Sequence, residues 1–213
     1  LVDEYDIAGG GIITELVHDE QEGLREEARQ REYAWLTGDV RAEDRATQYG
    51  HRAAIVLFTG SAQTGKTFLA RRVEALLVAD SRHAYLLEGE NLLQGLDADL
   101  SAADPSFAAE RVRRYGEVAR LLIDTGLIVV STSKTFGINY QRMAEMIRTL
   151  VQPAPVIAVH MSRAGEEPPP NTDLHFAGPQ DFDAAARQIL EELKRRGVLI
   201  QPSGTKSTIQ YSI

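Results

Sequence analysis

The chain has 213 residues, which is enough for one medium-sized α/β domain with an appendage and a sizeable hydrophobic core. Its formal net charge of -8 argues against a general nucleic-acid-binding surface, and the sequence shows neither a membrane-spanning apolar run nor a signal peptide. The absence of cysteine excludes disulfide bonds and thiolate metal sites and fits a cytoplasmic protein, and the five histidines lie too far apart in the sequence to suggest a metal site.

The first residues, 1-LVDEYDIAGGGII-13, form an apolar stretch interrupted by glycines, a pattern typical of an edge strand with a tight turn. So short a segment cannot bury a face of its own, so we expect it to pack on another domain and the chain to be a fragment of a longer protein. The following residues are strongly charged and predict helices over 19–38 and 42–50. We interpret this zone as a solvated linker, with a binding element as the alternative.

From His51 onward, strand-like and helix-like segments alternate. The segment 53-AAIVLFT-59 is a continuous apolar run, which suits a strand buried on both faces. The alternation predicts an α/β fold, in which a parallel sheet has helices on both faces and binds ligands beyond the carboxyl ends of its strands. Further strands are predicted at 83–89, 127–132 and 156–161, and helices after residue 66, at 108–125, around 143–150 and at 181–196.

The stretch 58-FTGSAQTGKTFLA-70 contains the phosphate-loop pattern G-x-x-x-x-G-K-[ST] between the first buried strand and a helix. In such a loop, backbone N–H groups and the helix N-terminus bind phosphate, while Lys66 reaches the β- and γ-phosphates and Thr67 binds Mg²⁺. This context predicts a P-loop nucleoside triphosphate hydrolase or kinase fold, with a glycine turn and an exposed lysine as the alternative. The residues predicted to hold nucleotide are Gly60, Ser61, Ala62, Gln63, Thr64, Gly65, Lys66, Thr67 and Phe68.

Two further segments follow predicted strands and carry groups suited to phosphoryl transfer. Glu88 and Glu90 come at the end of the second strand, where carboxylates can assist Mg²⁺ or accept the proton of an acceptor hydroxyl. The alternative is a solvated acidic turn. The hydroxyls and the lysine of 131-STSKTF-136 follow the third strand and are expected to line the acceptor side.

A cluster of arginines lies on a predicted helix before the third strand. Guanidinium groups match the geometry of sulfate and phosphate, so the cluster is a candidate anion site. Most helical arginines are only surface charges, and this is the alternative. The members of the cluster are Arg111, Arg113 and Arg114.

These pieces occur in an order that resembles adenylylsulfate kinase. The resemblance covers residues 51–199, with a further match in the lead-in, and is most specific at the phosphate loop and at the pattern RR-x-GEVA followed by GLIV. The matching stretches are 35-WLTGDVRAEDRATQYGHRAAIVLFTG-60, 88-EGEN-91, 95-GLDADLS-101 and 113-RRYGEVARLLIDTGLIVVS-131.

Members of this family phosphorylate the ribose 3'-hydroxyl of adenylylsulfate with MgATP, so the resemblance implies ATP and Mg²⁺ as cofactors and adenylylsulfate as substrate. It implies catalytic roles for Lys66, Glu88 and Glu90, with Thr67 as the metal ligand. It places Arg163 beside the adenine of the nucleotide. The residues that we expect to bind the substrate are Asn91, Arg113, Arg114, Ser131 and Thr135, together with Arg111, an arginine that the family's pattern does not have at this place.

Several positions depart from the family's pattern. Gln63 stands at an inner glycine position of the phosphate loop, and the family's D-G-D-N reads Glu-Gly-Glu-Asn at 88–91. Two arginines that contact the substrate in the family are missing, one after Asn91 and one in the segment 107–111. The fourth strand passes almost directly to 162-SRAGEEPPPNTDL-174, so the family's basic lid is shortened, which should leave the reaction more open to water.

The stretch 2-VDEYDIAGGGII-13 resembles the last strand of the elongation-factor-like GTPase subunit of sulfate adenylyltransferase, which some bacteria fuse to the kinase. The resemblance implies a trailing strand of a preceding β-barrel domain at 1–16, a charged helical linker at 17–50 and a kinase-like domain at 51–213. The GTPase domain is then an expected partner, and a homodimer stays open. The hypotheses are a working adenylylsulfate kinase, a degenerate nucleotide-binding module that regulates or docks to the GTPase half, and a P-loop kinase with another small acceptor.

Overall fold

The computed structural model describes residues 35–36, 38–132, 140–178 and 181–200. The predicted strand at 1–13 and almost all of the predicted helix at 19–38 lie outside these residues. Within the part of the chain that is described, no helix is both long enough and apolar enough to span a membrane.

Five parallel strands form a single sheet in the order β2-β3-β1-β4-β5. The strands are β1 (Ala54–Gly60), β2 (Ala84–Glu88), β3 (Ile128–Thr132), β4 (Val156–Ser162) and β5 (Leu174–Ala177). The helices are α2 (Ala42–Tyr49), α3 (Lys66–Ala79), the 3-10 helix η1 (Gly89–Leu92), α4 (Phe107–Asp124), α5 (Tyr140–Val151) and α6 (Phe182–Arg195). Each strand and helix predicted in this part of the chain is present, with ends shifted by a few residues.

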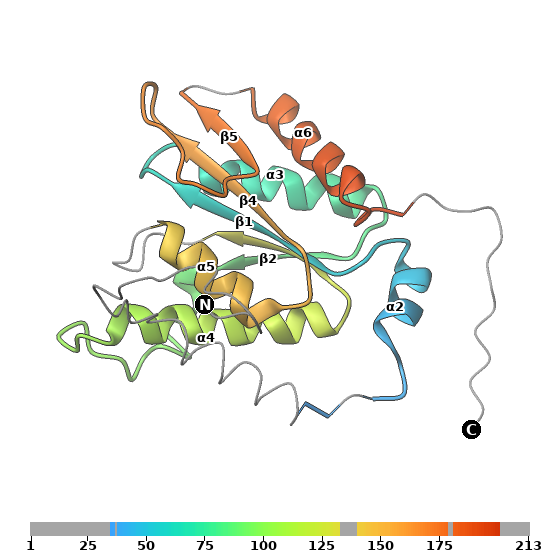
Figure 1. Ribbon diagram of the computed structural model, residues 1–213, viewed down its shortest axis with the longest axis horizontal. Helices are drawn as coiled ribbons and strands as arrows, with labels where there is room; N and C mark the ends of the chain where they lie inside the picture. Colours follow the sequence, from blue (N-terminus) through green and yellow to red (C-terminus); the bar gives the residue numbers. More distant parts are fainter. Residues whose placement is uncertain (1–34, 37, 133–139, 179–180, 201–213) are drawn as a thin grey trace, which may run out of the picture.

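The central strand β1 is buried along its whole length and divides the core into two layers. Alternate side chains point to opposite faces, so Val56 and Phe58 pack with α3 and α6, whereas Ile55 and Leu57 pack with α4 and α5. Figure 1 shows these helix pairs on the two sides of the sheet. The predicted α/β fold with helices on both faces is confirmed.

The short strand β5 was not predicted from the sequence. It contains four residues, of which only Phe176 is buried, so its apolar signal is too weak to identify a strand. It pairs with the carboxyl half of β4 from Val159 to Ser162 and therefore supports the edge of the sheet near the phosphate loop.

The opposite edge of the sheet is formed by β2. The Glu74 carboxylate on α3 accepts a hydrogen bond from the backbone N–H of Leu86 at 2.6 Å, so a charged side chain covers part of this strand edge.

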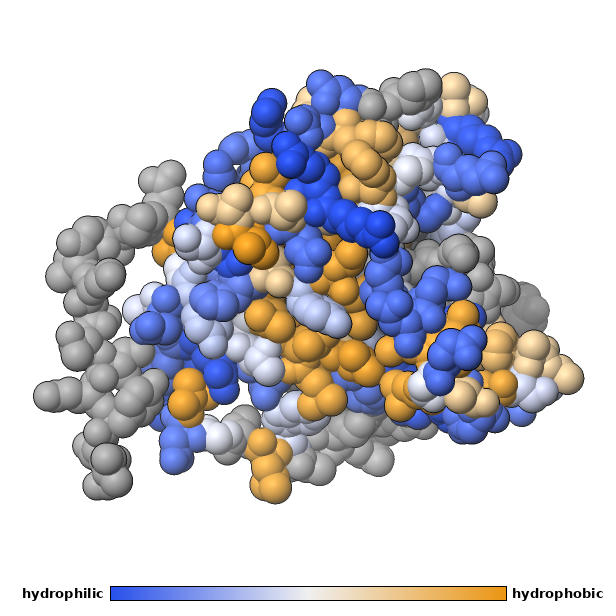
Figure 2. Space-filling view, turned by 180° about the vertical axis from the view of Figure 1, so that it is seen from behind, coloured by the Kyte–Doolittle hydropathy of each residue, from blue (hydrophilic) through white to orange (hydrophobic). Residues whose placement is uncertain are grey.

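Seen from behind, the molecule has a hydrophobic area in the middle of its surface with hydrophilic residues around it (Figure 2). Tyr85 of β2 and Leu121 of α4 are exposed large side chains.

The buried ring of His51 joins the amino ends of β1 and β2. Its Nε2 accepts a hydrogen bond from the His83 backbone N–H at 2.9 Å, and its Nδ1 donates to the Arg52 carbonyl at 3.2 Å. These contacts require a neutral ring with the proton on Nδ1. Burial lowers the pKa of His51 below its usual 6.5, and the neighbouring His83 and Arg82 lower it further.

Tyr115 links the core to the carboxyl ends of two strands. Its hydroxyl donates to the Leu87 carbonyl of β2 at 2.8 Å and lies 2.5 Å from the Ser131 hydroxyl of β3. The side chain is buried, and burial raises the pKa of the phenol, so the hydroxyl is neutral and able to donate. This single side chain therefore fixes β2 and β3 next to each other where the sheet faces the predicted site.

We expect Tyr115→Phe to lower the free energy of unfolding by about 1–2 kcal/mol, because it leaves buried oxygen atoms without their hydrogen bond. Tyr85→Phe is the matched control, since Tyr85 is 48% exposed, and we expect a change of less than about 0.5 kcal/mol. Urea unfolding of the three proteins measures both values. Equal stability of the Tyr115→Phe and Tyr85→Phe variants would contradict the role given to the Tyr115 hydroxyl.

The stability of the fold should fall as the pH drops below about 6.5, partly through His51. Because its folded-state pKa is lowered, His51 stabilises the fold fully above its unfolded pKa, and this contribution is lost as the pH falls towards the folded value. The uptake of one proton on unfolding changes the free energy of unfolding by at most about 1.4 kcal/mol per pH unit. Urea midpoints at a series of pH values should therefore fall less steeply for His51→Gln than for the wild type; identical slopes would refute this.

Candidate active site

The phosphate loop lies between the end of β1 and the start of α3, as predicted. Gly60 has φ 121° and a side chain there would overlap the backbone of Met161, so only glycine fits. Gly65 has φ 89° and faces the ring of Phe182, which leaves no room for a Cβ atom. Gln63, which replaces a glycine of the family pattern, also has a left-handed φ of 63°, a conformation that costs a non-glycine residue roughly 1 kcal/mol.

Lys66 is the first residue of α3 and its side chain folds over the loop. Its Nζ donates to the carbonyl oxygens of Gly60 at 2.9 Å and Ser61 at 2.5 Å. The Thr64 hydroxyl donates to the same Ser61 carbonyl at 2.9 Å. Burial lowers the pKa of Lys66. The ammonium group of Lys66 lies beside the N-terminus of α3, where the helix dipole is positive. Together, the two form an anion-binding arrangement.

Glu166 is a residue of this site that the sequence reasoning missed. Its Oε2 accepts hydrogen bonds from the Ser61 hydroxyl at 2.6 Å and from the Arg163 backbone N–H at 3.1 Å. These two donors, the Ser61 hydroxyl above all, lower the pKa of Glu166. Arg163 itself, predicted to lie beside adenine, is exposed in the same turn and thus close to the loop. The signal in the sequence that could have pointed to Glu166 was its position three residues after Arg163.

Two histidines that are distant in the sequence meet under the phosphate loop. The Nδ1 of His160 lies 3.0 Å from the Thr59 hydroxyl, and the Nε2 of His175 lies 2.8 Å from the Ser162 hydroxyl. Their ring centroids are 6.0 Å apart. Burial lowers the pKa of His160, and His175 and Lys66 add to this effect. Among the described residues, no three His, Cys, Asp or Glu side chains form a group that could hold a metal.

Glu88 lies at the carboxyl end of β2, and so at the same end of the sheet as the phosphate loop. Its Oε2 accepts a hydrogen bond from the Thr132 hydroxyl at 2.8 Å, and its Oε1 lies 3.7 Å from the Arg71 guanidinium. Within the described part of the chain, this buried Oε1 accepts no hydrogen bond. A buried, unsatisfied carboxylate oxygen is suited to bind a cation or a hydroxyl proton. Glu90 is half-buried and Asn91 exposed on the following η1.

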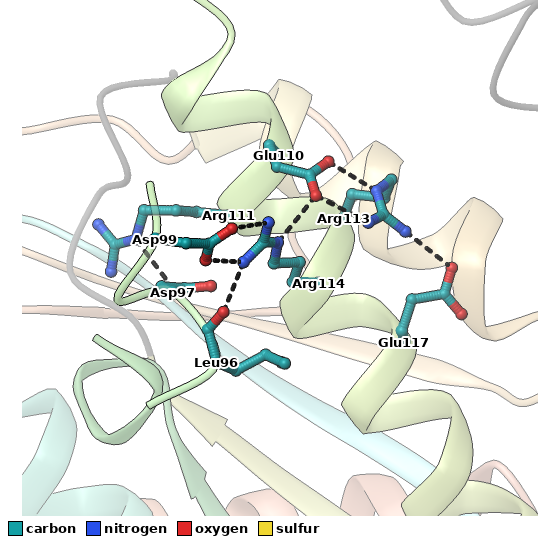
Figure 3. A network of polar contacts seen from close by, with 8 residues as sticks. All are labelled: Leu96, Asp97, Asp99, Glu110, Arg111, Arg113, Arg114 and Glu117. Atoms are coloured by element: carbon teal, nitrogen blue, oxygen red, sulfur yellow. Dashed lines mark hydrogen bonds and ion pairs between the residues drawn. The ribbon is translucent and has the colours of Figure 1, made fainter. Parts of the chain in front are cut away.

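The arginines of α4 contact acidic side chains of the protein (Figure 3). Arg114 forms two hydrogen bonds to the Asp99 carboxylate, at 2.5 and 2.9 Å, and one to the Leu96 carbonyl at 2.5 Å. Arg113 forms two hydrogen bonds to Glu110, both of 2.7 Å, and these lower the pKa of Glu110 to about 2. Arg114 also binds Glu110 within the same helix, whereas its bonds to Asp99 and Leu96 fasten the preceding loop to α4.

Arg111 lies deeper than the other arginines of the cluster. Its side chain is 9% exposed and its Nε is 3.3 Å from the Asp97 carboxylate, which is itself buried. The guanidinium carbon lies 5.4 Å from the ring centroid of Phe107, within the range of a cation–π contact. Each arginine predicted to bind the substrate thus has an intramolecular acidic partner, and its contact with a substrate stays a prediction.

The remaining predicted residues lie in different environments. Ser131 is fully buried and contacts the Tyr115 hydroxyl, so it stabilises the carboxyl end of β3 from within the core. Phe68 is 62% exposed and its ring centroid lies 4.8 Å from that of Phe182, beside the phosphate loop. Thr135 lies outside the described residues. Thr67 is half-buried in the first turn of α3, next to Lys66.

A pocket of about 400 Å³ lies away from these residues. It is next to the amino ends of β3 and β4, at the end of the sheet opposite to the phosphate loop, and the Arg120 guanidinium stacks over the Trp35 ring at 4.5 Å. Its lining residues are Trp35, Arg120, Ile123, Asp124, Val151, Gln152 and Pro153, none of which was predicted to bind a ligand.

Comparison with known proteins agrees with the geometry of the phosphate loop. The sequence model of the family described as adenylylsulphate kinase matches residues 52–168. An adenylyl-sulfate kinase of Yersinia pestis is 29% identical over 194 residues, covering 78% of this chain and 89% of that protein. One from Shewanella amazonensis is 38% identical over 128 residues, covering 60% and 63%.

A solved structure shows the same likeness in three dimensions. A mutant of the Mycobacterium tuberculosis APS kinase CysC, where APS is adenylylsulfate, superposes with a TM-score of 0.59 and 29% sequence identity. The match covers 68% of this chain and 99% of that one. The family match includes the phosphate loop, the end of β2, the arginine cluster and the turn that carries Glu166. The chain belongs to the adenylylsulfate kinase family.

Proposed function

We propose that this protein transfers the γ-phosphoryl group of MgATP to the 3'-hydroxyl of adenylylsulfate and so forms 3'-phosphoadenylylsulfate in sulfate activation. The observation that carries the proposal is that Lys66 and Glu88 lie at the same end of the sheet. The strands are parallel, so the lysine after β1 and the carboxylate with an unsatisfied oxygen after β2 both lie at the carboxyl ends of the strands. This arrangement, in a member of the adenylylsulfate kinase family, suits transfer of a phosphoryl group to a hydroxyl.

On the nucleotide side, the loop from Gly60 to Phe68 surrounds the phosphates with backbone N–H groups. Lys66 leaves its carbonyl partners to neutralise negative charge on the transferred group. The Thr67 hydroxyl and the Glu88 carboxylate are oxygen ligands of the kind that Mg²⁺ prefers, and the buried Oε1 of Glu88 fits such a role. When bound, the metal supplies further charge neutralisation; one or two carboxylates with substrate phosphates are enough to hold it.

On the acceptor side, Glu88 and Glu90 are the groups able to accept the proton of the 3'-hydroxyl. Glu88 is oriented by the Thr132 hydroxyl, which binds one of its oxygens and leaves the other without a hydrogen bond to any described residue. We propose that the substrate pocket is shaped by Asn91, the arginine cluster, Ser131 and Thr135. For Arg113 and Arg114, this requires that a substrate anion share or replace their present carboxylate partners.

Those ion pairs favour a second candidate function. Since Arg111, Arg113 and Arg114 already contact acidic side chains, the chain could bind nucleotide without accepting adenylylsulfate. It would then act as a regulatory or docking module of the sulfate adenylyltransferase subunit, or phosphorylate another small acceptor. The proposal also includes several features that rest on the sequence alone: the trailing strand at 1–16, the linker at 17–50, the fused GTPase partner, a homodimer and the cytoplasmic location.

The decisive experiment is an assay of purified protein with ATP, Mg²⁺ and adenylylsulfate, combined with calorimetric titration of each nucleotide. Conversion of adenylylsulfate to its 3'-phosphate is the expected result. ATP binding without turnover, or without adenylylsulfate binding, would favour the second candidate function. A protein that binds neither nucleotide would refute both.

Lys66→Ala should weaken MgATP binding about 10- to 100-fold, because charge-assisted hydrogen bonds to phosphate contribute about 1.5–3 kcal/mol. Turnover should fall at least as much, since the same charge stabilises the transition state. The matched control is Lys194→Ala on α6, whose exposed lysine pairs with Glu191 and should leave both values unchanged. An unchanged dissociation constant for Lys66→Ala would show that the loop does not bind the phosphates.

Glu88→Gln should lower turnover about 10²- to 10⁴-fold, the range expected for loss of a general base or of a charge beside the reacting groups. Binding of ATP in the absence of metal should change less than about threefold, because Gln can still accept the Thr132 hydrogen bond. Glu90→Gln separates the two carboxylates. A normal rate for Glu88→Gln together with a strongly reduced rate for Glu90→Gln would transfer the proposed role to Glu90.

A further inference from the structure

Ser61 makes more contacts at the base of the phosphate loop than its place in the sequence motif requires. Its backbone N–H donates to the Met161 carbonyl at 3.0 Å, and its own carbonyl accepts from both Lys66 and Thr64. Its hydroxyl donates to the Glu166 carboxylate at 2.6 Å. Ser61 is therefore held by β4 of the sheet, by Lys66 of α3 and by the separate turn that contains Glu166.

The turn that holds Ser61 places a negative charge beside an anion-binding loop. Within it, the Glu166 N–H donates to the Arg163 carbonyl at 3.2 Å and the Ser162 hydroxyl donates to the Glu166 carbonyl at 3.3 Å, while Gly165 has φ 86°. The carboxylate is held by two donors on one oxygen, which favour its ionised form. Glu166 is exposed, so burial does not require this fixed position, whereas a ligand of the loop would lie close to its charge.

We propose that Glu166 is a specificity-determining residue that favours magnesium-bound nucleotide over metal-free nucleotide at the phosphate loop. This inference rests on the proposed function, specifically on nucleotide binding at Ser61–Thr67. The carboxylate repels a polyphosphate that approaches the loop, and the repulsion grows with the net charge of the ligand. Metal-free ATP carries a charge of about -4 and MgATP about -2, so the carboxylate opposes the metal-free form roughly twice as strongly.

Local charges are consistent with this role for the turn. Lys66 attracts both forms of the nucleotide, because its ammonium group lies at the loop regardless of the metal. His160, below the loop, has a lowered pKa and so adds little positive charge near neutral pH. Glu166 is thus a negative charge at the loop itself that can distinguish the two forms by repulsion, in addition to Glu88 at the end of β2.

The substitution Glu166→Gln tests the charge without removing the contacts. The amide oxygen of glutamine can take the place of Oε2 and accept from both Ser61 and Arg163, so the fold and the loop should be retained. Glu166→Asp keeps the charge. Glu167→Gln is the matched control, since it removes the same charge at the next residue, which is exposed like Glu166.

The measurement is calorimetric titration of each protein with ATP, once with Mg²⁺ and once with EDTA. For Glu166→Gln, we expect metal-free ATP to bind about tenfold more tightly than to the wild type and MgATP about threefold more tightly, so the preference for MgATP falls about threefold. Glu167→Gln should change each constant less than about twofold. Glu166→Asp should keep the preference of the wild type.

Other outcomes overturn the proposal in recognisable ways. Weaker binding of both forms by the same factor in Glu166→Gln would show that the carboxylate only supports the loop structurally. An unchanged ratio of the two constants would show that its charge does not select the metal-bound form, and would leave the proposed function standing. If the wild type binds ATP under neither condition, the phosphate loop does not hold nucleotide, and the proposed function fails together with this inference.

Discussion

The site depends on how closely β1 and β4 approach each other at Gly60. A side chain there would overlap Met161, whose carbonyl also accepts the Ser61 N–H at 3.0 Å. Because β1 and β4 are buried along their whole length, the hydrophobic core fixes the point at which the phosphate loop begins. The loop then needs only one turn to place Lys66 at the N-terminus of α3. Core packing thus positions the anion-binding groups.

The sequence predicted those parts of the molecule whose signal is local. Buried parallel strands are continuous apolar runs, amphipathic helices have a regular period, and the phosphate loop has fixed glycine spacing, so each could be recognised without knowing its neighbours. The four-residue β5 has no such signal, because it is stabilised by pairing with β4. Glu166 could not be identified for the same reason: Ser61, its partner, lies 105 residues earlier in the chain.

The arginine cluster shows a second limit of sequence reasoning. The helical spacing of Arg111, Arg113 and Arg114 correctly indicated a concentration of positive charge on α4. It could not show that Asp97 and Asp99, from the preceding loop, contact two of these side chains. A pattern of charges indicates that anions will be attracted, whereas only the fold determines whether they come from a ligand or from the protein itself.

The two sides of the proposed site are therefore built in different ways. The nucleotide side follows from consecutive residues on rigid elements, and a change there would disturb the core through Gly60 and Gly65. The acceptor side is assembled from η1, the loop before α4 and the arginines that fasten it, where the ion pairs of Arg113 and Arg114 are partly exposed and contribute little to stability. Apart from the buried Arg111–Asp97 pair, substitutions of these charged residues carry a small cost in folding free energy. A member of this fold can thus change its acceptor, or lose it, while its phosphate loop stays intact.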